Sequence, residues 1–159
     1  MLAKAGHLSP NAIKCLEPNM DKMKVPNREH DDESFFSDDY VEIFLIPGLD
    51  PNGTVYQVMI NCAGMTWEAK DKKPEGWNPK IEVKASRESD YWVVEMVVPL
   101  AEISANIPRP QWRMNIGRSR PARGDAPAQE VSWAILNSTS SHTYQKFHAV
   151  TIESLEKQK

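Results

Sequence analysis

The stretch that decides the fold is Phe35-Phe36-Ser37-Asp38-Asp39-Tyr40-Val41-Glu42-Ile43-Phe44-Leu45, which runs from an acidic, aromatic loop into a strand. Successive side chains of a strand point to opposite faces, so Glu42 shares a face with Tyr40 and Phe44. The residues that alternate with them are aliphatic and predict a core-facing side. A carboxylate between two rings suits a sugar, which offers both hydroxyl groups and flat C–H faces. The alternative is that Glu42 pairs with an arginine inside a sandwich.

Length and composition predict a single domain over residues 1–159. The chain has 40% hydrophobic and 26% charged residues, as ordinary globular proteins do. A net charge of -3 gives no case for a nucleic-acid partner, and no apolar run approaches the ~20 residues that span a membrane. The first residues lack the apolar stretch of a signal peptide. Cys15 and Cys62 lie in apolar contexts and predict two buried free thiols.

Period-two alternation of apolar and polar residues dominates the chain and indicates short strands. The expected strands are 11–17, 40–46, 54–62, 80–86, 91–98, 111–119, 130–136 and 146–152. Twelve prolines and seven glycines argue against long helices, so only short helical turns are expected, at 18–23 and 100–104. The pattern predicts an all-β fold, an antiparallel, jelly-roll-like β-sandwich.

Two long connections carry opposite charge. Residues 26–39 are rich in acids, and arginines gather between 109 and 123. The simplest account is that the two segments pair with each other. Acidic oxygens also suit calcium, although their spacing here matches no EF-hand loop. The candidate ligands of a structural calcium are Asp31, Asp32, Asp38 and Asp39.

Motifs of catalysis are absent from the sequence. It has no phosphate-binding glycine loop, no Cys-x-x-Cys, no Gly-x-Ser-x-Gly and no histidine spacing typical of zinc. Glu42 and Glu95 both lie in apolar strands and could form a glycosidase pair, but pairing with arginines explains them better. We therefore expect no enzyme.

The sequence contains aromatic and polar residues of the types that bind sugars. The five tryptophans are Trp67, Trp77, Trp92, Trp112 and Trp133. Trp92 and Trp112 are in phase with apolar residues and predict core positions, whereas Trp133 precedes a Ser/Thr-rich loop. Gln57 and Asn61 share one face of their strand and could supply polar contacts.

The order of these motifs resembles that of carbohydrate-binding modules of family 9, or of family-9-like domains in the DOMON-like group, over about residues 11–152. The most specific element is Ser37-Asp38-Asp39-Tyr40-Val41-Glu42-Ile43-Phe44. The other similar stretches are 16–23, 56–61, 77–85, 91–100, 112–118, Ser132-Trp133 and Phe147-His148.

The resemblance implies a β-sandwich that holds a sugar between two aromatic rings, with polar groups and structural calcium nearby. Carried over by motif, Phe36 takes the first ring position, Trp133 the second, and Glu42 the acidic position. The same transfer adds three polar side chains: Gln57, Asn61 and Arg118. Arg118 has an alternative role as a structural partner of Glu42.

The resemblance also implies partners and a location. The expected ligand is an oligo- or polysaccharide, the expected neighbour a glycoside hydrolase domain, and the expected place the cell exterior or surface. No cofactor beyond structural calcium is expected. Phe36 stands where the family commonly has tryptophan, and only about ten residues precede the strand near Ala12-Ile13-Lys14-Cys15, where the family has further strands. N-terminal strands are therefore expected to be missing or supplied by another chain.

Two other functions remain open. A haem-binding electron-transfer domain of the same broad fold would use methionine and histidine as axial ligands, here Met59, Met114 or His148. A structural module of a larger enzyme would have no ligand.

Overall fold

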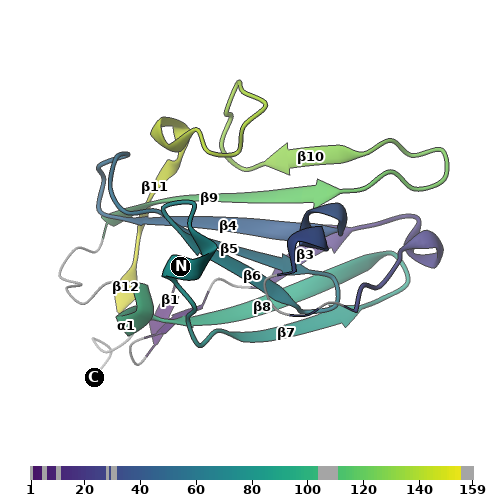
Figure 1. The fold of residues 1–159 in the computed structure, drawn as a ribbon, viewed down its shortest axis with the longest axis horizontal. Coiled ribbons are helices and arrows are strands. Elements are labelled where there is room, and N and C mark those ends of the chain that lie inside the picture. The colour runs from purple at the N-terminus through teal and green to yellow at the C-terminus, as the bar shows by residue number, and fades with distance from the viewer. Residues whose placement is uncertain are drawn as a thin grey trace.

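The computed structural model describes residues 2–4, 7–9, 12–27, 29, 32–103 and 111–154, and it forms a sandwich of two sheets (Figure 1). In the first sheet the strand order is β10-β9-β4-β5-β6, and β11 also pairs with β9. Its strands are β4 (Tyr40–Pro47), β5 (Tyr56–Asn61), β6 (Thr66–Lys70), β9 (Gln111–Arg120), β10 (Gln129–Ser132) and β11 (His148–Thr151). All pairs in this sheet are antiparallel.

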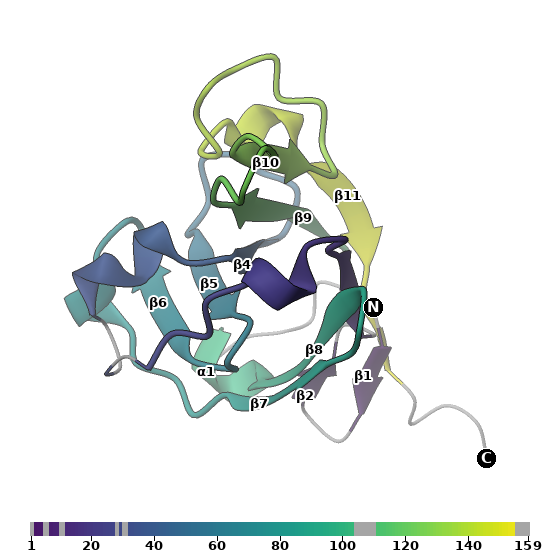
Figure 2. The ribbon, with the colours of Figure 1, turned by 90° about the vertical axis from the view of Figure 1, so that its right-hand side faces the viewer.

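The second sheet has the order β12-β1-β2-β8-β3, with β7 on the other side of β8. Its strands are β1 (Leu2–Lys4), β2 (His7–Ser9), β3 (Ile13–Leu16), β7 (Glu82–Arg87), β8 (Tyr91–Pro99) and β12 (Glu153–Ser154). Only β1 and β12 pair in parallel among the described strands. Because β11 leads directly into β12, the end of the chain passes from one sheet to the other (Figure 2). The predicted all-β sandwich is confirmed.

Helical structure is confined to single turns in the described part of the chain. The turns are η1 (Met20–Lys22), η2 (Glu33–Ser37), η3 (Pro74–Gly76), α1 (Leu100–Ile103) and η4 (Tyr144–Lys146). The predicted turns at 18–23 and 100–104 correspond to η1 and α1, and Ser104 lies outside the described residues. No helix among these is long and apolar enough to cross a bilayer.

Four strands were missed by the sequence analysis: β1, β2, β6 and β12. Each has five residues or fewer, which is too short for a clear alternation. β6 follows β5 through a tight turn in which Gly64 has a φ of +83°, a conformation that favours glycine. β1 and β2 form a hairpin beside β8, so the residues before β3 themselves supply strands. The absence of further N-terminal strands stays a prediction.

The main core lies between the sheets. Val41, Ile43 and Leu45 point into it and pack with residues of the second sheet, among them Trp92. Cys15 and Cys62 are buried and unbridged, as predicted, and burial raises the pKa of the Cys15 thiol to about 12.

The outer face of the first sheet, which is turned away from the second sheet, is covered at both ends. At one end, η2 brings Phe35 onto a cluster of buried residues: Met59, Trp67 and Ala69. At the other end, the connection between β10 and β11 brings Phe147 and Tyr144 onto a second cluster: Phe44, Ile46 and Val55. β4 is therefore buried on both of its faces near Phe44, whereas Glu42 lies between the two covered ends.

Candidate functional site

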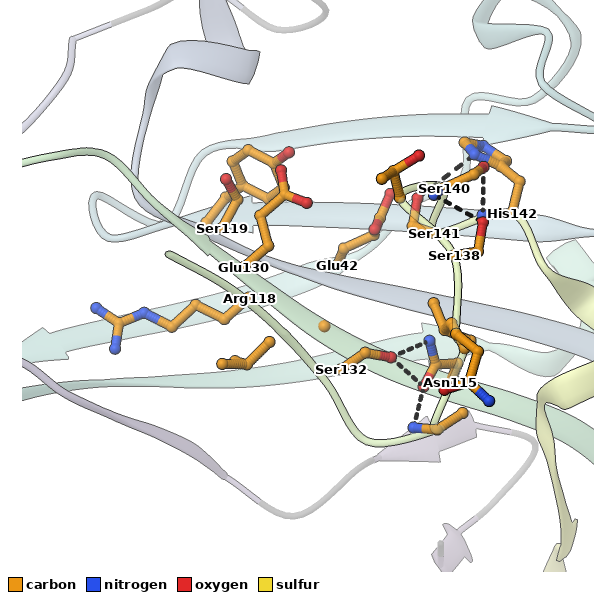
Figure 3. Close-up of a pocket in the computed structure, with 17 residues that line it drawn as sticks. Glu42, Asn115, Arg118, Ser119, Glu130, Ser132, Ser138, Ser140, Ser141 and His142 are labelled. Carbon is orange, nitrogen blue, oxygen red and sulfur yellow. Dashed lines mark hydrogen bonds between the residues drawn. The ribbon is translucent and has the colours of Figure 1, made fainter. Parts of the chain in front are cut away.

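A groove of about 620 Å³ lies on the outer face between these two covers (Figure 3). Its lining residues come from β4, β9, β10 and the loop that follows β10. The strand residues are Tyr40, Glu42, Asn115, Gly117, Arg118, Ser119, Glu130, Val131 and Ser132, and the loop contributes Ala134 and residues 136–142. Hydroxyl groups and carboxylates dominate this lining, so the groove is suited to a polar ligand.

Glycine opens the floor of the groove. Glu42 stands opposite Gly117 in the pairing of β4 with β9. A Cβ atom at Gly117 would lie 3.2 Å from the Val131 carbonyl oxygen and 3.8 Å from Glu42 Oε2. A side chain at this position would therefore press on the Val131 carbonyl oxygen and touch the Glu42 carboxylate, whereas glycine leaves the space beside the carboxylate open.

Glu42 has an amide partner and, among the described residues, no cationic one. Gln57 Nε2 donates a hydrogen bond of 2.6 Å to Glu42 Oε1. Burial raises the pKa of the Glu42 carboxyl to about 7, while hydrogen bonds from Gln57 and Ser141 lower it and the charge of Glu130 raises it. The alternative in which an arginine pairs with Glu42 is wrong, because among the described residues no ion pair involves it.

Hydrogen bonds fix the wall of the groove to its floor. The Asn115 side chain donates to Ser132 Oγ at 2.9 Å and accepts from the Ala134 backbone amide at 2.9 Å. Further along the loop, Ser138 Oγ accepts from the Ser140 amide, and Ser140 Oγ accepts from the His142 amide. These bonds hold a row of hydroxyl groups at the edge of the groove before any ligand arrives.

Two predicted polar residues have different surroundings. Gln57 is buried and positions Glu42. Asn61 is completely buried, donates to Asp38 Oδ2, and accepts from the Ala63 and Met65 amides in the turn between β5 and β6. Asn61 does not line the groove, so its contacts are those of a turn-forming residue.

Arg118 is directed away from the groove, as Figure 3 shows, although its residue forms part of the lining. Its guanidinium donates to both carboxylate oxygens of Asp39, at 2.9 and 2.8 Å, and to the Leu16 carbonyl oxygen. The predicted alternative in which Arg118 is the structural partner of Glu42 is wrong, because its carboxylate partners are Asp39 and Glu17.

An ion-pair cluster surrounds that guanidinium, and we define it as Glu17, Asp39, Arg118, Arg120 and Arg123. Arg123 donates hydrogen bonds to both Glu17 and Asp39, and Arg120 Nη1 lies 3.6 Å from Glu17 Oε1. Both carboxylates have fully buried side chains. The predicted pairing of the acidic connection with the arginines is therefore present, and Glu17 joins it from the end of β3.

The candidate calcium ligands are occupied by other partners. Both oxygens of Asp39 accept from arginine, Asp38 accepts from Asn61, and Asp32 accepts from Ser34 at the start of η2. Asp31 lies outside the described residues. No group of three or more acidic, histidine or cysteine side chains in the described part of the chain could hold a metal. The described candidate residues therefore do not fit a calcium site, and calcium binding stays a prediction.

The two predicted aromatic platforms do not face each other. Phe36 is 52% exposed, packs edge-on against Trp67 and borders a second hollow of about 530 Å³. This hollow shares Ser119 and Glu130 with the groove, so the two are adjacent. Trp133 is also half exposed, but its ring lies 4.5 Å from that of His148 and outside the groove.

Strand alternation explains the position of Trp133. Ser132 is opposite Gly117 in the pairing of β10 with β9 and lines the groove. The backbone amide of Trp133 continues this pairing with a hydrogen bond to the Ile116 carbonyl oxygen. The next side chain therefore points to the other face of the sheet.

The residues of the haem and glycosidase hypotheses are dispersed. Met59 belongs to the outer cluster near Phe35, Met114 to the main core, and His148 stacks on Trp133. Glu95 is exposed on β8, in the sheet that does not contain Glu42, so the two do not form a catalytic pair.

Several residues of the groove were not singled out from the sequence as site residues. They are Asn115, Gly117, Ser119, Glu130, Ser132 and residues 138–142. The Ser/Thr-rich loop was noticed, but the register that places Gly117 and Ser132 beside Glu42 carries no signal in a single sequence.

Solved structures share this fold. No protein-family model matches the chain, and no curated protein matches its sequence. A family 9 carbohydrate-binding module from Caldicellulosiruptor kristjanssonii in complex with glucose aligns with a TM-score of 0.60 and 13% identity, over 93% of this chain and 72% of that one. A "putative carbohydrate-binding protein" from Bacteroides uniformis aligns with a TM-score of 0.55 and 15% identity, over 92% and 71%. The chain therefore has a family-9-like carbohydrate-binding-module fold, which the sequence resemblance predicted.

Proposed function

We propose that this chain is a non-catalytic domain that binds an oligo- or polysaccharide in the groove around Glu42. The observation that supports the proposal most strongly is the lining of that groove, in which hydroxyl and carboxylate groups surround a half-buried acid. The shared fold adds to it, because one solved example of that fold holds glucose.

The polar groups would select the ligand. A buried acceptor without a partner costs about 1–3 kcal/mol, so a ligand that satisfies Glu42 is favoured over one that does not. Gln57 bonds Oε1 of the carboxylate and Ser141 also bonds this group, while Oε2 lies toward Gly117, the side from which a sugar hydroxyl would approach. With a pKa of about 7, the carboxyl can accept a hydrogen bond when ionised or donate one when protonated.

An apolar surface is available in the same groove. Tyr40 lines it, and its ring is supported from behind by Phe35 at a centroid distance of 5.7 Å. A sugar ring that bonds Glu42 would therefore find an aromatic neighbour two residues away on the same face of β4. Phe36 lies farther along, in the adjacent hollow, and would contact a second sugar unit.

We further propose that the domain is an accessory module of a glycan-degrading system and acts outside the cell. This part follows from the family resemblance and not from the groove. It can be tested separately by sequencing the genomic region around the gene, where an export signal and a glycoside hydrolase domain are the expected finding.

The test of binding combines calorimetry with nuclear magnetic resonance. Isothermal titration against gluco-, xylo- and manno-oligosaccharides should give saturable heat with at least one of them. The same ligand should shift the backbone amide signals of Gly117, Ser119 and Ser140, while those of Lys84 and Glu95 on the second sheet stay unchanged. Binding that shifts only signals near Trp133 would place the site elsewhere, and silence across the panel would refute the proposal.

A further inference from the structure

The groove contains two carboxylates that no cation in the described part of the chain neutralises. Glu42 lines it from β4 and Glu130 from β10. The charge of Glu130 raises the pKa of Glu42, so the two carboxylates interact electrostatically. No ion pair or hydrogen bond of Glu130 is found among the described residues, and Glu42 bonds only amide and hydroxyl groups. The negative charge is therefore uncompensated within the groove.

The arginines that line the groove and the adjacent hollow face the other way. Arg118 contributes to the lining, but its guanidinium is bound to Asp39 and Glu17 on the opposite face. Arg120 lies in the adjacent hollow, where its guanidinium bonds the Pro127 carbonyl oxygen and faces Glu17. These guanidinium groups already bond other groups among the described residues and do not form ion pairs with Glu42 or Glu130.

Both acids also interact electrostatically with Tyr40. The charges of Glu42 and Glu130 raise the pKa of its phenol, after the larger effect of burial. The ring therefore lies within the field of both carboxylates, and a ligand stacked on it would be exposed to that field. A ring face and nearby negative charge both attract cations.

We propose that the preferred ligand of the groove is a cationic saccharide, an amino sugar whose ammonium group lies between Glu42 and Glu130. This inference rests on the proposed saccharide binding and names the chemical class of the sugar. An ammonium ion would bond the acids through charge-assisted hydrogen bonds, which are roughly twice as strong as neutral ones. The neighbouring hydroxyl groups of Ser119, Ser132 and Ser140 remain for the uncharged positions of the sugar.

The ligands that test this proposal differ at a single position. The β-1,4-linked trimers of glucosamine, N-acetylglucosamine and glucose carry an ammonium, an acetamido and a hydroxyl group at C2. Titrations at about pH 7.2 keep most of the amine protonated, since comparable α-amino groups have a pKa of about 7.7–8.0. At this pH more than half of Glu42 is ionised, since its pKa is about 7. We expect the glucosamine trimer to bind about tenfold more tightly than either neutral trimer.

Two matched variants locate the charge effect. Glu130→Gln removes one groove carboxylate and should bring the three trimers to within about twofold of each other. Glu82→Gln removes an equal charge from an exposed position on β7, in the other sheet, and should leave the preference unchanged. Thermal unfolding of both variants confirms that they are folded.

The outcomes separate the two proposals. If a neutral trimer binds as well as the glucosamine trimer, the cationic preference is refuted while saccharide binding stands. A preference for glucosamine that survives Glu130→Gln also refutes it, because Glu130 would then not hold the ammonium group. A preference that falls equally with Glu82→Gln refutes it as well, because the attraction would then come from the net charge of the protein. If no trimer and no other saccharide binds, the proposed function fails as well.

Discussion

Two acidic residues only three positions apart, Asp39 and Glu42, have opposite surroundings. Asp39 is buried in the ion-pair cluster, where Arg118 and Arg123 donate to its oxygens. Glu42 is half-buried in the groove, where its closest partner is the neutral amide of Gln57. The first acid is neutralised by the protein, and the second is the one that we propose bonds a ligand.

The difference follows from the alternation of side chains in β4 and the strand beside it. Arg118 is opposite Val41 in β9, so its side chain points to the core-facing side, where Asp39 lies. Glu42 is opposite Gly117, which has no side chain to offer on the outer face. The two faces of one strand thus carry a structural acid and the acid of the proposed binding site.

The largest expected effect is on the ion-pair cluster. Glu17→Ala leaves the guanidinium groups of Arg118 and Arg123 partly unpaired in a buried place, which costs about 3–5 kcal/mol of unfolding free energy. Urea denaturation at pH 7 measures it. Glu82→Gln, at an exposed position, should change the same quantity by less than about 0.5 kcal/mol. A loss below about 1 kcal/mol for Glu17→Ala would show that water reaches the cluster.

An intermediate effect is expected from the ionisation of Glu42. Its folded-state pKa of about 7 exceeds the ordinary value of 4.5, so the folded protein binds this proton more tightly than the unfolded chain. The unfolding free energy therefore decreases as pH rises from about 4.5 to about 7, by about 2 kcal/mol, since water in the groove screens part of the burial cost.

The variant Glu42→Gln removes this decrease. Denaturation in urea at pH 5, 6, 7 and 8, without ligand, should show the wild type losing its stability advantage relative to the variant as pH increases. Parallel curves for the two proteins would mean that Glu42 ionises with an ordinary pKa.

The smallest expected effects concern the two exposed rings. Phe36→Ala should weaken binding of an oligosaccharide that reaches the adjacent hollow by about three- to tenfold, because stacking on a ring is worth about 0.5–1.5 kcal/mol. Trp133→Ala should leave saccharide affinity within about twofold, because its ring lies outside the groove. Titration calorimetry of both variants distinguishes them, and a larger loss for Trp133→Ala would favour a binding site on the other face.

Much of the fold was predictable because the alternation in 40–46 is long and regular. It assigned Val41, Ile43 and Leu45 to one face correctly. The site was less predictable because it depends on contacts between distant residues. Arg123 meets Glu17 across more than 100 residues of chain, and no local pattern signals that pairing.

Trp133 shows that a sequence motif does not predict which face of the sheet a side chain occupies unless the strand register is known. An exposed tryptophan beside a Ser/Thr-rich loop suited a sugar platform, and it is indeed half exposed. Its neighbour Ser132 occupies the groove side of the sheet, which turns Trp133 away. A difference of one residue along the strand decided the result.

The loop after β10 is anchored at both ends, by the bond of the Ala134 amide to Asn115 and by Phe147 in the outer cluster. Among the groove-lining residues between these anchors, 137–140 are exposed and contribute nothing to the outer clusters. If saccharides bind as we propose, evolution or a randomised library could therefore exchange this segment to reach new glycans while the scaffold is retained. The proposed site would in this respect be built like that of an antibody, with a fixed framework and a replaceable loop.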